Sequence, residues 1–414
     1  MNVLKIATAG SVDDGKSTLI GRILYDTKSL TDDKLQEIED KSKQRGFDYL
    51  DFSLATDGLV AEREQGITID VAHIYFSTNT TSFIIADTPG HVEYTRNMVT
   101  GASTSQASII LIDARNGVVE QTYRHFFINN LLRVKNIVVA VNKMDLVDYS
   151  EEKFISIKNE ILALAEKSDY KDQNIHFVPI SALHGDNVVA TSKNINWYTG
   201  KSLLDYLEAI EVSDQKTAQA RFPVQTVIRP KTEEYHDYRG YAGKLYGGDL
   251  SVGDDVIILP SETSSKVKSI EFFNGSFTTA KSGSSITVTL EDDVNVSRGD
   301  MIVKNGQQPN ITKQIEATIC WMDKTPLQAF NKYYIKHGIN DAQAKITSLT
   351  SLIHTDFSGK EENPSELTLN EIGEITLKTS KPLFVDSYQN NKSNGAFILI
   401  DAKTNNTAGV GFIK

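Results

Sequence analysis

Short apolar runs and amphipathic stretches alternate along the first 210 residues, which predicts strands and helices in turn. The first apolar run, Lys5–Ala9, reads as a buried strand, and helical periodicity follows over residues 19–24. A charged helix is predicted to begin at Thr31, with Gly46 near its end. Further strands are predicted at 71–77, 82–86, 109–113, 137–141 and 176–180, with helices at 92–103, 119–132, 151–167 and 201–210. This alternation is typical of a parallel sheet covered by helices on both faces.

The pattern changes after about residue 212. A polar stretch at 211–221 resembles a linker, and short strands separated by Gly-containing turns begin at Phe222. These strands predict a small β-barrel at 222–310. A second β-rich stretch, 311–414, is predicted to form a third domain.

Composition narrows the class of protein. The 414 residues are 40% hydrophobic and 23% charged, and no apolar run approaches the ~20 residues of a membrane span. The start of the chain lacks the charged and apolar regions of a signal peptide, and the single cysteine, Cys320, excludes an internal disulfide. We therefore expect a cytoplasmic protein. The net charge of −11 argues against a general nucleic-acid binder, although a local basic patch could still bind RNA.

Residues 10–18 carry the pattern G-x-x-x-x-G-K-S between the first predicted strand and the first helix. This context is typical of a phosphate-binding loop, in which backbone N–H groups and the helix N-terminus face a phosphate. Lys16 is predicted to reach the β- and γ-phosphates, and the Ser17 hydroxyl to ligate Mg²⁺. The alternative is a Gly-rich turn without a ligand.

Further residues are expected to complete the phosphate and metal site. The Thr68 hydroxyl is predicted to ligate Mg²⁺, and its N–H to sense the γ-phosphate. Asp87 ends a strand and is predicted to hold Mg²⁺ directly or through water. Gly90 has no side chain, so its N–H can approach the γ-phosphate. His91 can hold the attacking water in line, although the spacing fits a surface histidine equally well.

Asn142-Lys143-Met144-Asp145 follows another strand and predicts the base. The Asp145 carboxylate can accept hydrogen bonds from guanine N1–H and the 2-amino group, whereas adenine would present a lone pair to it. Ser181-Ala182 is expected to add a backbone N–H for guanine O6. The alternative is an ordinary turn at a strand end. Four other histidines lack such context and are interpreted as structural: His73, His125, His176 and His184.

These motifs resemble those of translation-factor-type GTPases and, among them, the large GTP-binding subunits of bacterial sulfate adenylyltransferase. The resemblance spans nearly the whole chain, and the Asp13-Asp14 pair and Arg239–Gly243 are its discriminating variants. Elongation factors usually carry His or Ser where Asp14 stands. The matching stretches are 10–18, 61–70, 87–91, 94–98, 142–149, 181–183, 185–187, 197–198, 222–225, 239–243 and 297–300.

The resemblance implies an α/β P-loop GTPase domain at 1–212 followed by two β-barrel domains, at 222–310 and 311–414. GTP hydrolysis would drive formation of adenylylsulfate and pyrophosphate from ATP and sulfate by a separate small catalytic subunit, in a heterodimer or larger assembly. No nucleic acid or membrane partner is expected. The implied cofactors are GTP and Mg²⁺, and K⁺ is a candidate because an aspartate at the Asp13 position holds a monovalent cation in some relatives.

The same resemblance implies the site residues. His91 would be catalytic, and Mg²⁺ would be held by Ser17, Thr68 and Asp87. Two departures from the family pattern, at Val92-Glu93 and around 350–374, lie away from the nucleotide. The residues implied in GTP binding are Asp13, Asp14, Gly15, Lys16, Ser17, Thr18, Asp87, Gly90, Asn142, Lys143, Asp145, Ser181, Ala182 and Leu183.

Two rival functions fit parts of the pattern. One is an elongation factor that carries aminoacyl-tRNA, which would need a pocket for the aminoacyl end and basic patches for the acceptor stem. The acidic balance leans against it without excluding it. The other is a signalling GTPase without an enzymatic partner, which two trailing β-domains of this size disfavour.

Overall fold

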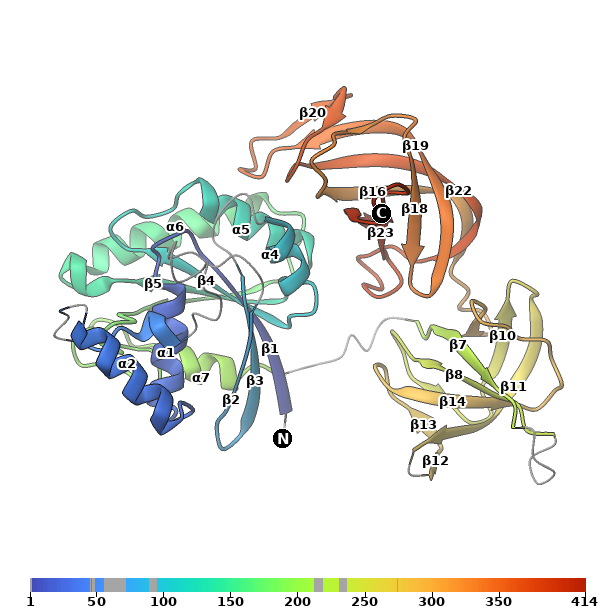
Figure 1. Ribbon diagram of the computed structural model, residues 1–414, viewed down its shortest axis with the longest axis horizontal. Helices are drawn as coiled ribbons and strands as arrows, with labels where there is room; N and C mark the ends of the chain where they lie inside the picture. Colours follow the sequence, from blue (N-terminus) through green and yellow to red (C-terminus); the bar gives the residue numbers. More distant parts are fainter. Residues whose placement is uncertain are drawn as a thin grey trace. The chain divides into compact units, whose positions relative to one another are not determined.

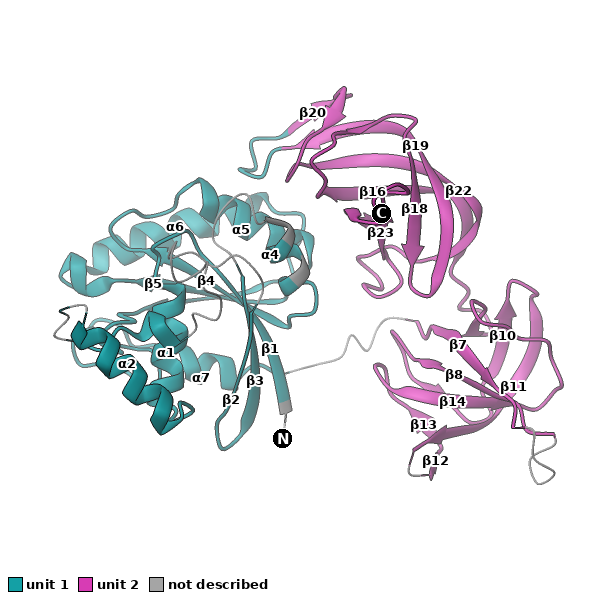
Figure 2. Ribbon diagram, in the orientation of Figure 1, with its two compact units in different colours: residues 1–212, 354–359 teal, residues 213–353, 360–414 magenta. Residues whose placement is uncertain are grey.

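The computed structural model describes residues 2–44, 46, 49–55, 72–88, 95–211, 219–230, 237–273 and 275–414. The chain divides into two compact units, residues 1–212 with 354–359 and residues 213–353 with 360–414 (Figure 2). The first unit carries the α/β pattern. In its described parts, the second unit contains strands and no helix.

The first unit is built on a six-stranded sheet with the order β2-β3-β1-β4-β5-β6. Five strands are parallel, as the sequence predicts. The exception is β2, which runs antiparallel to β3 because only residues 78–80 join the two, and so short a connection turns the chain back. The strands are β1 (Asn2–Ala9), β2 (Ala72–Ser77), β3 (Thr81–Asp87), β4 (Ala107–Asp113), β5 (Asn136–Asn142) and β6 (Asn174–Pro179).

Helices cover both faces of this sheet (Figure 1). Buried side chains of α1 and α7 pack with Ile6, Ile109 and Val138 in one hydrophobic core. On the other face lie α4, α5 and α6 (Figure 1). The helices are α1 (Lys16–Asp26), α2 (Asp32–Gln44), α4 (Thr95–Ala102), α5 (Glu120–Leu131), α6 (Glu151–Lys167) and α7 (Leu203–Glu208), with short 3₁₀ helices η1 (Phe52–Ala55) and η3 (Met144–Val147).

The first sheet of the second unit has the order β10-β15-β7-β8-β14-β11-β12. A further pairing of β10 with β11 closes its first six strands around a core that includes Phe222 and Val288. Alternate burial along β14 and β11 matches one face toward this core and one toward solvent. The strands are β7 (Phe222–Ile228), β8 (Gly240–Lys244), β9 (Leu250–Ser251), β10 (Asp255–Leu259), β11 (Thr263–Phe272), β12 (Gly275–Phe277), β13 (Thr279–Ala280), β14 (Ser285–Leu290) and β15 (Met301–Lys304).

The second sheet has the order β18-β23-β24-β16-β22-β19-β20, and β18 also pairs with β19, which closes a six-stranded barrel. Trp321, which is fully buried, packs with Tyr333 in its core. The strands are β16 (Asn310–Trp321), β17 (Leu327–Gln328), β18 (Lys332–His337), β19 (Asn340–Ile353), β20 (Lys360–Glu362), β21 (Glu366–Leu367), β22 (Ile372–Val385), β23 (Ala396–Ile400) and β24 (Thr407–Ile413).

A buried ion pair joins the two sheets of the second unit. The Arg221 guanidinium, 1% exposed, donates from Nε and Nη2 to the Asp386 carboxylate at 2.9 and 2.8 Å. Its Nη1 donates to the carbonyls of Ala220 and Gln307 at 3.0 and 2.6 Å. Since a buried charge needs all its donors satisfied, this arginine constrains both strand systems at once.

The architecture confirms the predicted fold class of an α/β domain followed by β-domains. Each large sheet of the second unit lies essentially within one predicted range, 222–310 or 311–414, and this division stays our prediction for the domain boundary. No helix in the described ranges is both long and apolar enough to cross a membrane.

Candidate functional site

The N-terminus of α1, where the loop from β1 ends, has no side-chain cap among the described residues. Gly15 is the N-cap residue of α1, with φ of 92°. A β-carbon at Gly15 would lie 2.6 Å from the Asn142 Nδ2 atom, so only glycine fits this position. The first turn, which contains Ser17 and Thr18, therefore offers its free N–H groups and the positive end of the helix dipole to an anion.

Lys16 places a cation at the same loop. Its ammonium donates to the carbonyl oxygens of Gly10 at 2.7 Å and Ser11 at 3.2 Å. Burial lowers the pKa of Lys16, whereas the nearby carboxylates of Asp87 and Asp14 act in the opposite direction. A buried cation beside uncapped amides is a suitable environment for phosphate oxygens.

Asp14 turns toward the loop itself. Its carboxylate accepts the Ser11 N–H at 2.6 Å, and the residue is 5% exposed. Burial raises the pKa of Asp14, and the hydrogen bond from Ser11 and the charge of Lys16 oppose this. The side chain therefore braces the loop, whereas Asp13 is exposed and has a φ of 68°.

Asp87 ends β3, beside β1 in the sheet, and one of its carboxylate oxygens accepts the Thr8 hydroxyl at 2.8 Å. Asp87 is 2% exposed, and Ser17 on α1 is half-buried. A carboxylate and a hydroxyl are ligand types that Mg²⁺ prefers. Within the described ranges no group of three or more His, Cys, Asp or Glu residues could hold a metal. The predictions for Thr68, Gly90 and His91 lie outside the described residues.

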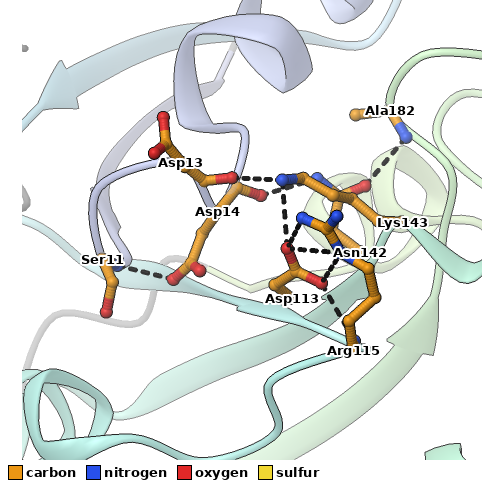
Figure 3. Close-up of polar contacts among 8 residues, drawn as sticks. All are labelled: Ser11, Asp13, Asp14, Asp113, Arg115, Asn142, Lys143 and Ala182. Carbon is orange, nitrogen blue, oxygen red and sulfur yellow. Dashed lines mark hydrogen bonds and ion pairs between the residues drawn. The ribbon is translucent and has the colours of Figure 1, made fainter. Parts of the chain in front are cut away.

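Asn142 connects the two loops that the sequence assigns to phosphate and base. Its Nδ2 donates to the Asp14 carbonyl at 2.8 Å, and its Oδ1 accepts the Ala182 N–H at 2.9 Å. The side chain is buried at the end of β5, and Figure 3 draws its contacts with both loops. One carboxamide thus determines the spacing between the phosphate-binding loop and the loop at 181–183.

Lys143 and Asp145 lie just beyond that strand. Lys143 has a φ of 60°, and its ammonium donates to the Asp13 carbonyl. The Asp145 side chain is 13% exposed, and His184 Nε2 lies 3.9 Å from its carboxylate. No motif spacing in the sequence relates His184 to Asp145, so their proximity is a result of the fold.

The loop at 181–183 uses two of its three N–H groups internally. Ser181 donates to the Asp186 carbonyl at 3.2 Å, and Ala182 donates to Asn142. Leu183 is then the residue of this loop whose N–H has no acceptor among the described residues. Its carbonyl accepts Arg22 Nη1 at 3.2 Å.

Sequence reasoning missed Asp113, which contacts Lys143, and Arg115, which contacts Asp113 (Figure 3). Asp113 ends β4, and its buried carboxylate receives Lys143 Nζ at 3.0 Å and Arg115 Nη2 at 2.7 Å. A signal was available: like Asp87, Asp113 is an aspartate at the carboxyl end of a buried parallel strand, the edge where ligands of such sheets bind.

Two protein families match the chain. The elongation factor Tu GTP binding domain family matches residues 1–213, which contain the whole candidate site. The GTP-eEF1A C-terminal domain-like family matches residues 314–414.

Known proteins match over nearly the whole chain. Sulfate adenylyltransferase subunit 1 of Bacteroides fragilis (strain YCH46) is 48% identical over 417 residues, 100% of this chain and 86% of that protein. Its counterpart in Colwellia psychrerythraea is 48% identical over 415 residues, 99% of this chain and 87% of that protein. The bifunctional enzyme CysN/CysC of Mycobacterium tuberculosis (strain ATCC 25618 / H37Rv) is 48% identical over 413 residues, 99% of this chain and 67% of that protein.

The geometry predicts that Gly15→Ala weakens binding of guanine nucleotides. The added methyl group would displace the Asn142 amide and its two hydrogen bonds, which corresponds to a loss of roughly tenfold to a hundredfold in affinity. Titration with a fluorescent GDP analogue measures it. Gly253→Ala is the matched control, because Gly253 has a similar φ of 86° and no described atom lies within 4 Å of its added β-carbon. Equal affinity in the two variants would contradict the prediction.

Proposed function

Since this chain belongs to the sulfate adenylyltransferase subunit 1 family, we propose that it hydrolyses GTP to drive adenylylsulfate formation by a separate small catalytic subunit. The single observation that carries this proposal is 48% identity along 100% of the chain to a subunit 1 protein. The matched GTP-binding domain supports GTP as the nucleotide. Apart from 10–18, the sequence contains no other phosphate loop and no His-x-x-His motif, so adenylyl transfer is assigned to the partner subunit.

The described residues are proposed to bind different parts of GTP, from the phosphates to the guanine base. The first-turn amides of α1 and the Lys16 ammonium bind the phosphates. Asp145 accepts the N1–H and 2-amino hydrogens of guanine, and the Leu183 N–H donates to O6 because Ser181 and Ala182 spend theirs within the protein. The proposed O6 donor is therefore Leu183, whereas the sequence predicts a backbone N–H from Ser181-Ala182.

Hydrolysis requires a water molecule and charge neutralisation at the γ-phosphate. Ser17, Thr68 and Asp87 are proposed to hold Mg²⁺, which when bound neutralises charge on the β- and γ-phosphates. His91 is proposed to orient the water that attacks the γ-phosphorus as the bond to the leaving GDP oxygen breaks. Gly90 allows its N–H close to the γ-phosphate.

GTP hydrolysis can drive the partner subunit only if the GTP-bound and GDP-bound states of this chain differ. GTP and GDP can drive adenylyl transfer only as far as the two nucleotide states differ in their interaction with the partner subunit. Affinities must then be reciprocal: a partner that tightens GTP is itself bound more tightly in the GTP state. The β-domains are the proposed carriers of this change.

Asp145→Asn is expected to shift preference from guanine to xanthine nucleotides. The amide cannot accept the two guanine hydrogens, but its NH₂ can donate to the C2 oxygen of xanthine. Competition of GTP, XTP and ATP against a fluorescent nucleotide measures this in both proteins. Equal competition by ATP and GTP in the unmodified protein would exclude the guanine assignment.

Potassium is expected to accelerate GTP hydrolysis through Asp13. The Asp13 carbonyl accepts the Lys143 ammonium, and the Asp13 carboxylate points away from that contact (Figure 3). We expect this carboxylate to approach a cation at the phosphates. GTPase rates in K⁺ and Na⁺ are compared for the unmodified protein and Asp13→Ala. The role is wrong if the unmodified protein turns over equally fast in both salts.

Coupling is expected to appear only in the reconstituted pair. The chain alone hydrolyses GTP slowly and makes no adenylylsulfate, whereas the pair makes more adenylylsulfate with GTP than with GDP or a non-hydrolysable analogue. His91→Ala slows cleavage, preserves GTP binding and removes the extra yield. The same yield with all three nucleotides would reject coupling, and protection of aminoacyl-tRNA would then test the elongation-factor alternative.

A further inference from the structure

Asp113 is a buried carboxylate that binds two cations from two loops. It stands at the end of β4, in register with Asn142 on β5, and its side chain is 1% exposed. The Arg115 guanidinium donates to both of its oxygens, with Nε at 3.0 Å from one and Nη2 at 2.7 Å from the other. The Arg115 backbone N–H adds a further hydrogen bond at 2.9 Å. These bonds determine the orientation of the carboxylate plane.

The same carboxylate holds Lys143, whose Nζ lies 3.0 Å from Asp113 Oδ2. Lys143 Nζ also donates to the Asp13 carbonyl in the phosphate-binding loop. Figure 3 shows these contacts as one chain, from Arg115 through Asp113 and Lys143 to Asp13. The end of β4 is therefore linked to the phosphate loop through a side chain of the guanine motif.

The charges make this link persistent. Burial alone raises the pKa of Asp113, but the hydrogen bonds from Arg115 and Lys143 outweigh burial and lower the pKa to about 2. The carboxylate is therefore ionised at neutral pH. The Lys143 side chain is 23% exposed and would reach solvent in other rotamers, so a fixed anion beside it restricts where its ammonium lies.

We propose that Asp113 and Arg115 are positioning residues of the nucleotide site: Asp113 holds the Lys143 ammonium against the phosphate-binding loop, and Arg115 orients Asp113. This inference rests on the proposed GTP site and deepens it, because neither residue belongs to the motifs that contact nucleotide. As long as Asp113 holds Lys143 against the phosphate-binding loop, bound nucleotide is expected to dissociate slowly. The competing explanation is that the Asp113–Arg115 pair only stabilises the turn between β4 and α5.

The test is a double-mutant cycle on the release rate of a fluorescent GDP analogue. Asp113→Asn is expected to speed release roughly tenfold or more in the unmodified background, because a charge-assisted contact of Lys143 is lost. In the Lys143→Ala background the same change is expected to have less than about a twofold effect, since Asp113 no longer has Lys143 to hold. Equal acceleration in both backgrounds would overturn the proposal in favour of a purely structural role.

Arg115 supplies a second variant that keeps the buried carboxylate and its lysine partner. Arg115→Met is expected to speed release several-fold only when Lys143 is present, and Arg115→Lys to restore part of the slow release. No change in Arg115→Met would overturn the role of Arg115. This variant also answers the case in which Asp113→Asn fails to fold.

The matched control is Asp386→Asn, which breaks an equivalent two-pronged pair with Arg221 in the second unit. It is expected to lower the unfolding temperature and leave GDP release within about twofold. Accelerated release in this control would show that any broken buried pair loosens the site, and would overturn the proposal. Failure of the unmodified protein to bind GDP would instead contradict the proposed function.

Discussion

The buried carboxamide of Asn142 is the contact on which the site depends. Its two polar atoms satisfy two different loops, the Asp14 carbonyl at 2.8 Å and the Ala182 N–H at 2.9 Å. A carboxamide has a donor and an acceptor at a fixed separation, so it fixes the distance between its two partners as well as attracting them. The absence of a β-carbon at Gly15 allows this approach. Phosphate and base sites are thereby held at one spacing.

The site around that contact also contains charged side chains that are buried on folding. Lys16, Asp14 and Asp113 are all buried, and burial disfavours the charged form of each. They differ in how they are compensated. Asp113 has two cationic partners and a pKa of about 2, whereas burial dominates at Asp14, whose pKa is raised. The negative charge of bound phosphates would interact favourably with Lys16 and unfavourably with Asp14. The position of an anion in the loop therefore matters as well as its charge.

The second unit also contains a buried and hydrogen-bonded charge pair, which joins its two sheets. Arg221 and Asp386 form a two-pronged pair that joins strand systems far apart in sequence, and Asn394 Nδ2 adds a hydrogen bond to Asp386 at 2.8 Å. A small apolar cluster also joins Leu259, Met301 and Val303 of the first sheet to Phe384 of the second. The proposal that the β-domains carry a nucleotide-dependent change to the partner requires the two barrels to be rigidly joined. Loosely joined barrels would move independently and would not pass the change on.

The sequence by itself determined the elements and the motif positions. Helix 151–167 is predicted at its observed limits, and the strands that end in Asp87 and Asn142 are placed within two residues, because apolar periodicity is a local property. Glycine, lysine and hydroxyl residues at fixed spacing likewise identify the phosphate loop without any tertiary information. The reversed direction of β2 follows from a three-residue connection whose turn the periodicity does not register.

Only the tertiary structure decided which of these residues meet. That Asp14 braces its own loop, that Leu183 keeps a free amide in the part of its surroundings that is described, and that Asp113 holds Lys143 all depend on side-chain direction. Asp113 and Lys143 are brought together because β4 and β5 lie side by side in parallel register. Arg221 and Asp386 are 165 residues apart, and no local pattern relates them. Pairings across a sheet or between barrels are set by packing, which spacing along one chain does not encode.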